Sequence, residues 1–452
     1  MNKKIHTALV FCLGILISCG SPAQAVGQPE LLRKDLTLRK VASLGAGFIR
    51  LAYDARTGEL IYMNPSGDLY RIKPTETKGT QLYAGSGVLG NDCMATGMTI
   101  GPDGAIYVTC NSKVAGTNTA RVRKGVFGVD GKRTWATLMQ TEPYPIGDTQ
   151  FDHDFNGLAV SPDGKWLYIN SGSRTDHGEV ENAKGLWPNL RELALTTTVF
   201  RIPATSKSLI ALPNDAAKLK ALGYVFAQGT RNCYDLAFAA NGDLFCGDNS
   251  PDADYPDEIN WLRAGRHYGF PWRLGDEDNA VIRPGYAPSA DKKLHDDFFA
   301  VAKNLYTFAP NFPAVPSGVK FTDPITNLGP DADSYRKPDG GEGDASREGK
   351  PLLGITPHRS PLGLAFDTAN ALSKDYKGGL FVLSWGSAGG TLRDVGQDLL
   401  LVKPTKRGDN YAATMTQIAR GFSRPIDSVL VGKKLYVLDF EGEGAIWEIE
   451  IP

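Results

Sequence analysis

The sequence lacks the features that define several large classes of protein. Its 49 Lys and Arg residues are balanced by 50 Asp and Glu residues, which argues against a nucleic-acid binder, because such a protein needs a clustered basic surface. It contains no C-x-x-C pair and no C-x-x-C-H motif, so covalent haem is excluded and a cysteine zinc site is disfavoured. After the first 25 residues, no apolar run is long enough to span a bilayer.

Runs with helical periodicity are also few, whereas turn-forming residues are abundant. The chain has 51 Gly and 28 Pro among 452 residues, with 42% hydrophobic and 22% charged residues. These hydrophobic and charged fractions are ordinary for a globular protein and exclude a disordered chain. Many glycines and prolines with few helical runs predict short strands joined by turns.

The N-terminus resembles a leader that does not belong to the fold. Two lysines precede an apolar run at residues 8–17, which is too short to cross a membrane. Cleavage after Ala23-Gln24-Ala25 would remove residues 1–25 as a signal peptide. The segment around Cys19 instead resembles a bacterial lipobox, in which residues 1–18 are removed and Cys19 is acylated. Both alternatives predict an exported protein, either periplasmic or attached to the membrane by a lipid.

The cysteines beyond the leader fit an oxidising compartment. Cys93 and Cys110 enclose one Asp-Gly turn, and Cys233 and Cys246 enclose an Asn-Gly turn. Because such turns reverse an antiparallel strand pair, the enclosing cysteines can face each other across it. We therefore predict two cross-strand disulfides.

One phrase recurs along the chain: an apolar stretch, a turn with glycine, and a short β-rich run. Its copies lie at residues 57–62, 102–108, 162–169, 241–246, 377–382 and 431–437. Recurrence of strands and turns at this spacing is typical of radially repeated sheets. The sequence therefore predicts an all-β fold, a six-bladed β-propeller over residues 35–452, with a long insertion between the fourth and fifth repeats at about 275–350.

Basic side chains stand just ahead of the innermost strand in four of these repeats. They are His153 in the third, Arg231 in the fourth, His358 with Arg359 in the fifth, and Arg424 in the sixth. Ligand sites in such rings lie where loops converge at one mouth of the channel. Together these residues predict a cationic site for a small anionic ligand. Taken singly, each is equally compatible with a structural or surface role.

Two positions carry specific chemistry. A histidine gains and loses a proton near neutral pH, so His153 is a candidate general base. Arg231 offers a planar fork of donors for an anionic or carbonyl group, and Asn232 can both donate and accept.

The fourth repeat resembles the glucose/sorbosone dehydrogenase family. The similarity is clearest in Arg231-Asn232, Leu236-Ala237-Phe238, Ser250-Pro251, Asp257-Glu258-Ile259-Asn260 and Tyr268-Gly269-Phe270-Pro271. The family consists of six-bladed propellers that use pyrroloquinoline quinone (PQQ). The resemblance therefore implies a dehydrogenase that oxidises an aldose or related polyol by hydride transfer to the quinone, and the leader predicts that it is exported. Because the sequence shows no haem or iron–sulfur ligands, we expect an external acceptor to receive the electrons.

The resemblance also assigns roles to residues. It implies an Asp-His pair at Asp152 and His153 in which the histidine is the base, and contact of Arg231 and Asn232 with quinone and substrate. It implies calcium bound through the backbone carbonyls of Ser250 and Pro251. Further cofactor contacts fall on His358 or Arg359, on Arg393, and on Arg424.

Two departures from the family pattern bear on the substrate. Ser173 stands where the family has an aspartate that supports the base, and Asp176 is the natural replacement. Arg393 stands where a lysine is expected. Two other classes of function stay open: a calcium-dependent lactonase-type hydrolase, and a non-catalytic binding propeller of the cell envelope.

Overall fold

The structure is a computed structural model of the chain. It describes residues 28–75, 80–128, 132–386 and 389–452. The predicted leader, with its alternative ends at Ala25 and Cys19, lies outside these residues. Within them, no helix combines the length and the apolar character needed to cross a membrane.

Most of the described chain forms short strands, as its turn-rich sequence predicts. The α-helices are short, α1 (Ala216–Leu222) and α2 (Phe299–Ala302). Five sheets have four or more strands, and a further sheet has three. Strands that follow one another in the chain pair antiparallel within most of these sheets, because tight turns join them.

The sheets comprise the following strands. The first contains β3 (Arg50–Asp54), β4 (Glu59–Met63), β5 (Leu69–Ile72) and β6 (Gln81–Ala84). The second contains β7 (Met94–Ile100), β8 (Ile106–Val114), β9 (Thr117–Phe127), β10 (Arg133–Thr141), β11 (Tyr144–Pro145) and β15 (Ile210–Leu212). The third contains β12 (Phe155–Val160), β13 (Trp166–Ser171), β14 (Thr198–Pro203) and β16 (Val225–Gln228). The fourth, of three strands, contains β17 (Cys233–Phe238), β18 (Leu244–Asp248) and β19 (Glu258–Leu262).

The last two sheets include strands from distant parts of the chain. The fifth contains β26 (Pro361–Phe366), β27 (Leu380–Ser384), β28 (Asp398–Arg407) and β29 (Asn410–Arg420), joined by β1 (Glu30–Leu31), β22 (Thr326–Pro330) and β25 (Leu352–Leu353). The sixth contains β30 (Pro425–Val431), β31 (Lys434–Asp439), β32 (Ala445–Glu450) and β2 (Thr37–Ser43).

The sheets are arranged as a β-propeller. Six strands, one from each sheet, contact one another in a ring: β3 contacts β7, β7 contacts β12, β12 contacts β17, β17 contacts β26, β26 contacts β30, and β30 contacts β3. The neighbouring strands approach closely, because a Cβ added at Gly97 would lie 1.9 Å from the carbonyl oxygen of Asn156. A Cβ at Gly157 would lie 2.7 Å from the carbonyl oxygen of Tyr234. Glycine is therefore required where these inner strands meet.

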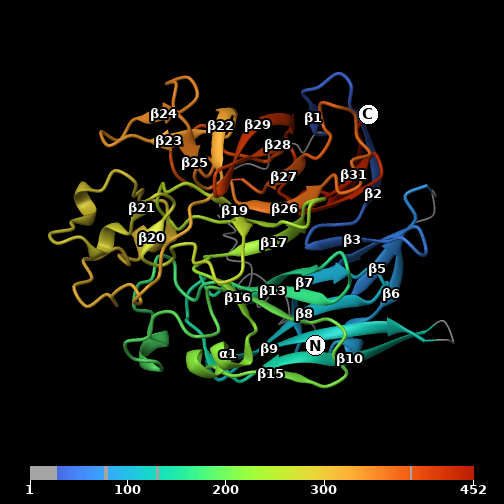
Figure 1. Ribbon diagram of the computed structural model, residues 1–452, viewed down its shortest axis with the longest axis horizontal. Coiled ribbons are helices and arrows are strands. Elements are labelled where there is room, and N and C mark those ends of the chain that lie inside the picture. The colour runs from blue at the N-terminus through green and yellow to red at the C-terminus, as the bar shows by residue number, and fades with distance from the viewer. Residues whose placement is uncertain (1–27, 76–79, 129–131, 387–388) are drawn as a thin grey trace.

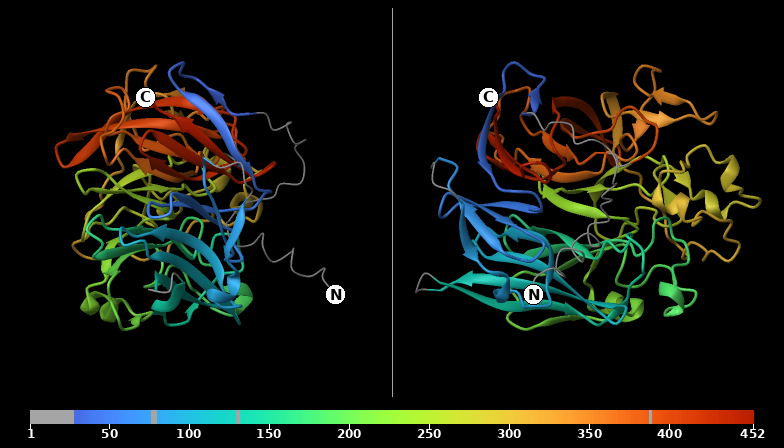
Figure 2. Two further views of the ribbon diagram at one scale, coloured as in Figure 1. Left: turned by 90° about the vertical axis from the view of Figure 1, so that its right-hand side faces the viewer. Right: turned by 180° about the vertical axis from the view of Figure 1, so that it is seen from behind.

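The two ends of the described chain meet in one sheet. β2 pairs antiparallel with β32 from Thr37 opposite Glu450 to Ser43 opposite Ala445. Figure 1 and Figure 2 show this pairing as a blue strand beside the red C-terminal strands. Main-chain hydrogen bonds between β2 and β32 thus close the ring.

Residues 275–350 contain several short elements between the fourth and fifth sheets. They include β21 (Glu277–Asp278), three-residue 3₁₀ turns at Ala280–Ile282 and Pro288–Ala290, α2, β23 (Ser334–Arg336) and β24 (Glu342–Asp344). Much of the segment lies to one side of the propeller in Figure 1, in yellow and orange, close to β20 (Arg273–Leu274). Its strand β22 pairs in parallel with β29, so part of this segment belongs to the fifth sheet.

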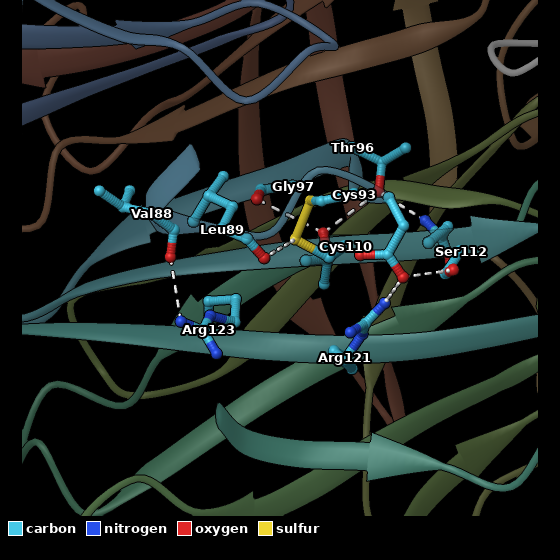
Figure 3. The surroundings of a disulfide bond; sticks show 12 residues. Val88, Leu89, Cys93, Thr96, Gly97, Cys110, Ser112, Arg121 and Arg123 are labelled. Carbon is cyan, nitrogen blue, oxygen red and sulfur yellow. Dashed lines mark hydrogen bonds and ion pairs between the residues drawn. A yellow bond between two sulfur atoms is a disulfide. The ribbon is translucent and has the colours of Figure 1, made fainter. Parts of the chain in front are cut away.

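Both predicted disulfides are confirmed. Cys93 bonds to Cys110, and Cys233 bonds to Cys246. Figure 3 shows the first of them, with Sγ of Cys110 next to the carbonyl group of Leu89. Cys110 lies on the strand β8. The first bond joins residues 17 positions apart and the second joins residues 13 positions apart, each across a single hairpin.

Removing a disulfide is expected to destabilise the fold through the unfolded state. In the chain-entropy model, a cross-link that closes a loop of about 15 residues stabilises by about 3 kcal/mol. We expect the double substitution Cys93→Ser with Cys110→Ser to lower the free energy of unfolding by about that amount. Denaturant unfolding of the variant and of the oxidised and reduced parent protein measures this. Equal midpoints for all of them would contradict it.

Candidate active site at the convergence of the inner strands

A cavity of about 130 Å³ lies where the loops ahead of the inner strands converge. Polar and basic side chains predicted from the sequence line it: His153, Arg231, Asn232, Ser250, His358 and Arg424. They come from segments ahead of β12, β17, β26 and β30 and from the segment after β18. The repeated position of these residues in the sequence thus becomes proximity in space.

Main-chain hydrogen bonds fix the loops that carry the histidine and the arginine. The N–H of His153 donates to the carbonyl oxygen of Ser173 at 2.9 Å, and the N–H of Ser173 donates to the carbonyl oxygen of Arg231 at 2.7 Å. Gly172 permits this approach, because a Cβ there would lie 2.4 Å from the Cβ of His153. The backbone of Ser173 thus fixes the loop that carries His153 relative to the loop that carries Arg231.

The imidazole of His153 is held in one tautomer. Its Nδ1 lies 3.2 Å from the carbonyl oxygen and 3.1 Å from Oγ of Ser173. Because a carbonyl oxygen only accepts, Nδ1 carries the hydrogen and Nε2 keeps its lone pair. Burial, with a smaller contribution from the charge of Arg231, lowers the pKa of His153 to about 3. The ring is therefore neutral at ordinary pH and suited to accept a proton.

The guanidinium of Arg231 is anchored by Asp176. Its Nε donates to the carbonyl oxygen of Asp176 at 2.8 Å, and its Nη2 donates to Oδ1 at 3.0 Å. Asp176 is fully buried, and Tyr306 and His177 bond its other oxygen at 3.0 Å. Burial raises the pKa of Asp176, but these donors outweigh it and hold the pKa at about 2. Asp176, the residue expected to replace the family's aspartate, thus fixes Arg231. The contact with His153 is made by Ser173 instead.

Asn232 is positioned by a buried carboxylate and by amides. Asp248 accepts the backbone N–H of Asn232, and it accepts the N–H of Arg231 at 2.9 Å. The side-chain oxygen of Asn232 accepts from Nδ2 of Asn156 at 2.7 Å. Burial raises the pKa of Asp248 to about 6 in spite of the two backbone donors. The Arg-Asn pair is therefore rigid before any ligand binds.

His358 is oriented by an ion-pair cluster that includes the 275–350 segment. Its Nε2 lies 2.9 Å from Oδ1 of Asp254, whose Oδ2 bonds His295 at 2.8 Å and Arg336 at 2.7 Å. Burial opposes ionisation of Asp254, but His358 and the other partners hold the pKa of this carboxyl at about 2. Burial lowers the pKa of His358, and the bond to Asp254 raises it. The net effect is an increase. The bond to Asp254 thus favours the charged form of His358.

Other sequence-predicted residues lie elsewhere. Asp152 is buried beside His153, but its carboxylate accepts from the N–H of Gly147 and does not line the cavity. Arg359 is buried in ion pairs with two aspartates. The side chain of Arg393 is 94% exposed and lies near Glu342. Pro251 lines a smaller neighbouring pocket. The structure therefore brings His358 and Arg424 to the cavity, and not Arg359 or Arg393.

Several lining residues escaped the sequence analysis. Asp252 follows Ser250-Pro251 in the loop after β18, and burial raises the pKa of its carboxyl to about 7. Trp385 follows β27, directly before a glycine, and its indole lines the cavity near Arg424. Phe298 reaches the cavity from the 275–350 segment. Asp252 directly follows the Ser250-Pro251 step in the sequence, whereas no local pattern marks Phe298.

Comparisons with known proteins bear on the family and the fold of the chain. The model of the glucose/sorbosone dehydrogenase family matches residues 41–321, more than half of the chain. A search of curated proteins finds no match. Among solved structures, the chain is similar to the apo form of the soluble aldose sugar dehydrogenase of Escherichia coli, with a TM-score of 0.56, 17% identity, and coverage of 92% of this chain and 100% of that one.

Two further solved structures are similar in fold. The PQQ-bound aldose sugar dehydrogenase of Streptomyces coelicolor has a TM-score of 0.52 and 17% identity, with coverage of 95% of this chain and 99% of that one. The holo form of the PQQ domain of pyranose dehydrogenase from Coprinopsis cinerea has a TM-score of 0.57 and 13% identity, with coverage of 94% and 97%. At these identities, the likeness establishes the fold alone.

Proposed function

Because the chain belongs to the glucose/sorbosone dehydrogenase family, we propose that it oxidises an aldose or related polyol with PQQ as cofactor and His153 as general base. The observation that carries this proposal is one cavity lined by a neutral histidine and by Arg231, Asn232, His358 and Arg424. A base, a fixed arginine and further cations in one place match the needs of alcohol oxidation by an anionic quinone.

The cavity residues fit such a cofactor. Carboxylates on a quinone require fixed cations and amide donors, and Arg231, Asn232, His358 and Arg424 supply them. Trp385 offers a flat aromatic wall. Nη1 of Arg424 donates to the carbonyl oxygen of Gly386 at 3.1 Å, which holds this arginine beside the cavity. When bound, the quinone supplies the hydride-accepting chemistry.

Calcium bound near Ser250 and Pro251 is part of the proposal. Calcium prefers oxygen ligands, including backbone carbonyls. The carbonyl oxygen of Pro251 already accepts from the N–H of Ala253 at 2.7 Å and retains a second lone pair. Ser250 and Asp252 both line the cavity. In the described residues, no cluster of three His, Cys, Asp or Glu side chains suits a metal, so carbonyl oxygens carry most of the proposed coordination.

The protein residues divide the work of the reaction. Nε2 of His153 removes the proton of the substrate hydroxyl as the carbon loses hydride. Arg231 holds the substrate oxygen and stabilises the negative charge that develops on it. Asp176 keeps the fork of Arg231 in place, and Asn232 donates to the same region. Phe151 and Phe298 exclude water from one side of the cavity.

The low pKa of His153 predicts an unusual pH profile. The base works only when unprotonated, and burial lowers its pKa to about 3. We therefore expect protonation of His153 to give kcat/KM no acid limb with a midpoint between pH 5 and about 7, where an ordinary histidine of pKa about 6.5 would give one. Ser173→Asp places a carboxylate beside Nδ1, which raises the pKa and moves the acid limb toward neutral pH. Initial rates from pH 4.5 to 8 test this. Asp252→Asn removes the carboxyl that has a pKa of about 7 in the same cavity, and a midpoint near 6.5 that persists in this variant would contradict the prediction.

Reconstitution tests the function directly. Apo protein is titrated with PQQ in the presence of calcium, and binding is followed by visible absorbance. Dye reduction is then measured over a panel of aldoses and polyols. We expect stoichiometric binding of the quinone and sugar-dependent reduction. Failure to bind PQQ would overturn the proposal and favour the hydrolase or the binding propeller, and lactone hydrolysis would separate these two.

The finer architecture and the cellular location belong to the same proposal. We take the three-stranded sheet as the fourth of six blades within a single domain of residues 35–452, and residues 275–350 as an insertion that reaches the cavity through Phe298. The two disulfides support an exported protein, either periplasmic or anchored through Cys19. An external acceptor then receives the electrons.

A further inference from the structure

A second cavity of about 650 Å³ lies on the other side of Asp176 from the candidate active site. The loop after β13 and the chain after α2 form it, with lining residues His177, Glu179, Asn189, Arg191, Asn304 and Phe308 among others. Among the described residues, none lines both cavities. We refer to the second cavity as the outer groove.

His177 forms the floor of the outer groove. It is only 1% exposed, and its Nδ1 lies 3.0 Å from Oδ2 of Asp176 and 3.4 Å from Oε2 of Glu179. Its ring stacks on Tyr306 at 3.8 Å. Nδ1 faces these buried carboxylates, so the opposite nitrogen, Nε2, is on the groove side. It has no hydrogen-bond partner within the described part of the chain. This nitrogen is thus available to a ligand in the groove.

The walls of the groove define the chemistry of that partner. Arg191 adds a cation, held against the ring of Phe312 at 4.7 Å. Glu179 is the only acid that lines the groove among the described residues, and both its oxygens accept backbone N–H groups, from Asp176 and His177. Arg191 therefore gives the groove a cation that can pair with a negative charge on a ligand.

The remaining lining groups suit a polyhydroxy compound. The side chains of Asn189, Asn304, Thr307 and Asn311 make no hydrogen bond to the described residues. They surround Phe308, which is 41% exposed. Amides and a hydroxyl that can donate and accept, beside an exposed aromatic ring, match the hydroxyl groups and the apolar face of a sugar.

We propose that the outer groove is a second ligand site that binds a sugar carboxylate between His177, Arg191 and Phe308. The part of this proposal that concerns regulation rests on the proposed function. Oxidation of an aldose yields a lactone, and hydrolysis of the lactone yields a compound of this class. The groove then senses the product.

Asp176 couples the outer groove to the active site. Its Oδ2 bonds His177, and its Oδ1 accepts from Nη2 of Arg231 and from the backbone N–H of Asp252, each at 3.0 Å. A ligand that bonds Nε2 of His177 acts on the same carboxylate that fixes Arg231. Occupancy of the groove therefore changes the binding of the sugar, and by linkage the sugar changes the binding of the carboxylate by the same factor.

Calorimetry on the full-length protein without quinone tests the site. D-gluconate is the probe, and sorbitol is its neutral comparator of similar size. We expect gluconate to bind one to one and sorbitol to bind roughly tenfold or more weakly. Arg191→Gln and Phe308→Ala should each weaken gluconate binding by a similar factor, the latter without lowering Tm because the ring is exposed, while Asn232→Ala in the active site should leave gluconate binding unchanged. Absence of binding, equal binding of sorbitol, or sensitivity to Asn232→Ala alone would overturn the site.

The coupling has a separate test on the reconstituted enzyme. Gluconate should shift the KM for an aldose in the parent protein and not in Arg191→Gln. An unchanged KM in the parent at saturating gluconate would overturn the coupling. Calorimetry requires neither quinone nor turnover, so failure of the proposed function leaves the binding result intact and the two failures are distinguishable.

Discussion

His153→Ala is expected to lower kcat by about 100- to 10,000-fold, the usual contribution of a positioned general base. The imidazole of His153 bonds Ser173 through Nδ1 and lines the cavity. Its removal should therefore leave the affinity for PQQ nearly unchanged. Steady-state dye reduction at saturating sugar, with reconstituted quinone, measures the loss.

A second histidine provides the control for this experiment. His267 lies outside the cavity, packed between Trp272 and Phe321. His267→Gln should retain kcat. If His153→Ala turned over as fast as the parent protein, another group would have to be the base, and the proposed division of roles would be wrong.

Asp176→Ala is expected to cost about 3–5 kcal/mol in the free energy of unfolding, the usual result of breaking a buried ion pair. The substitution leaves Arg231, His177 and Tyr306 without their shared acceptor. It should also lower kcat, because Arg231 loses the partner that orients its fork. Denaturant unfolding and dye reduction measure the two effects.

Milder variants keep this prediction testable if Asp176→Ala does not fold. Tyr306→Phe removes one donor and should cost about 1 kcal/mol. Asp409→Ala is the surface control, since this aspartate is 77% exposed and pairs with Arg263 and Arg266. Its stability should match that of the parent. Equal stability of Asp176→Ala and Asp409→Ala would show that the buried carboxylate does not hold the site together.

The hairpins and the disulfides could be predicted because their causes are local. The turns at 102–104, 162–164 and 241–242 join β7 to β8, β12 to β13, and β17 to β18. A turn and its flanking strands are set by neighbouring residues. The cysteines that enclose such a turn are brought together by the hairpin itself, so their pairing followed from the same pattern.

The partners of the site residues could not be predicted in this way. Arg231 and Asp176 are 55 residues apart and meet because loops from two sheets converge. The conformation of such loops depends on contacts that no short pattern encodes. The repeats did indicate that basic residues share the mouth of the channel. They could not distinguish His358, which lines the cavity, from its neighbour Arg359, which is buried in ion pairs.

Closure of the ring by β2 and β32 has a consequence for biosynthesis. β2 ends at Ser43 and its partner begins at Ala445, so this N-terminal strand has no partner until nearly the whole chain has been translated. At a ribosomal rate of about 5–20 residues per second, this interval is roughly 20–80 s. During that time the nascent polypeptide exposes an unpaired strand edge, which is open to aggregation. A holding chaperone, or transport before folding, would protect it until its C-terminal partner emerges.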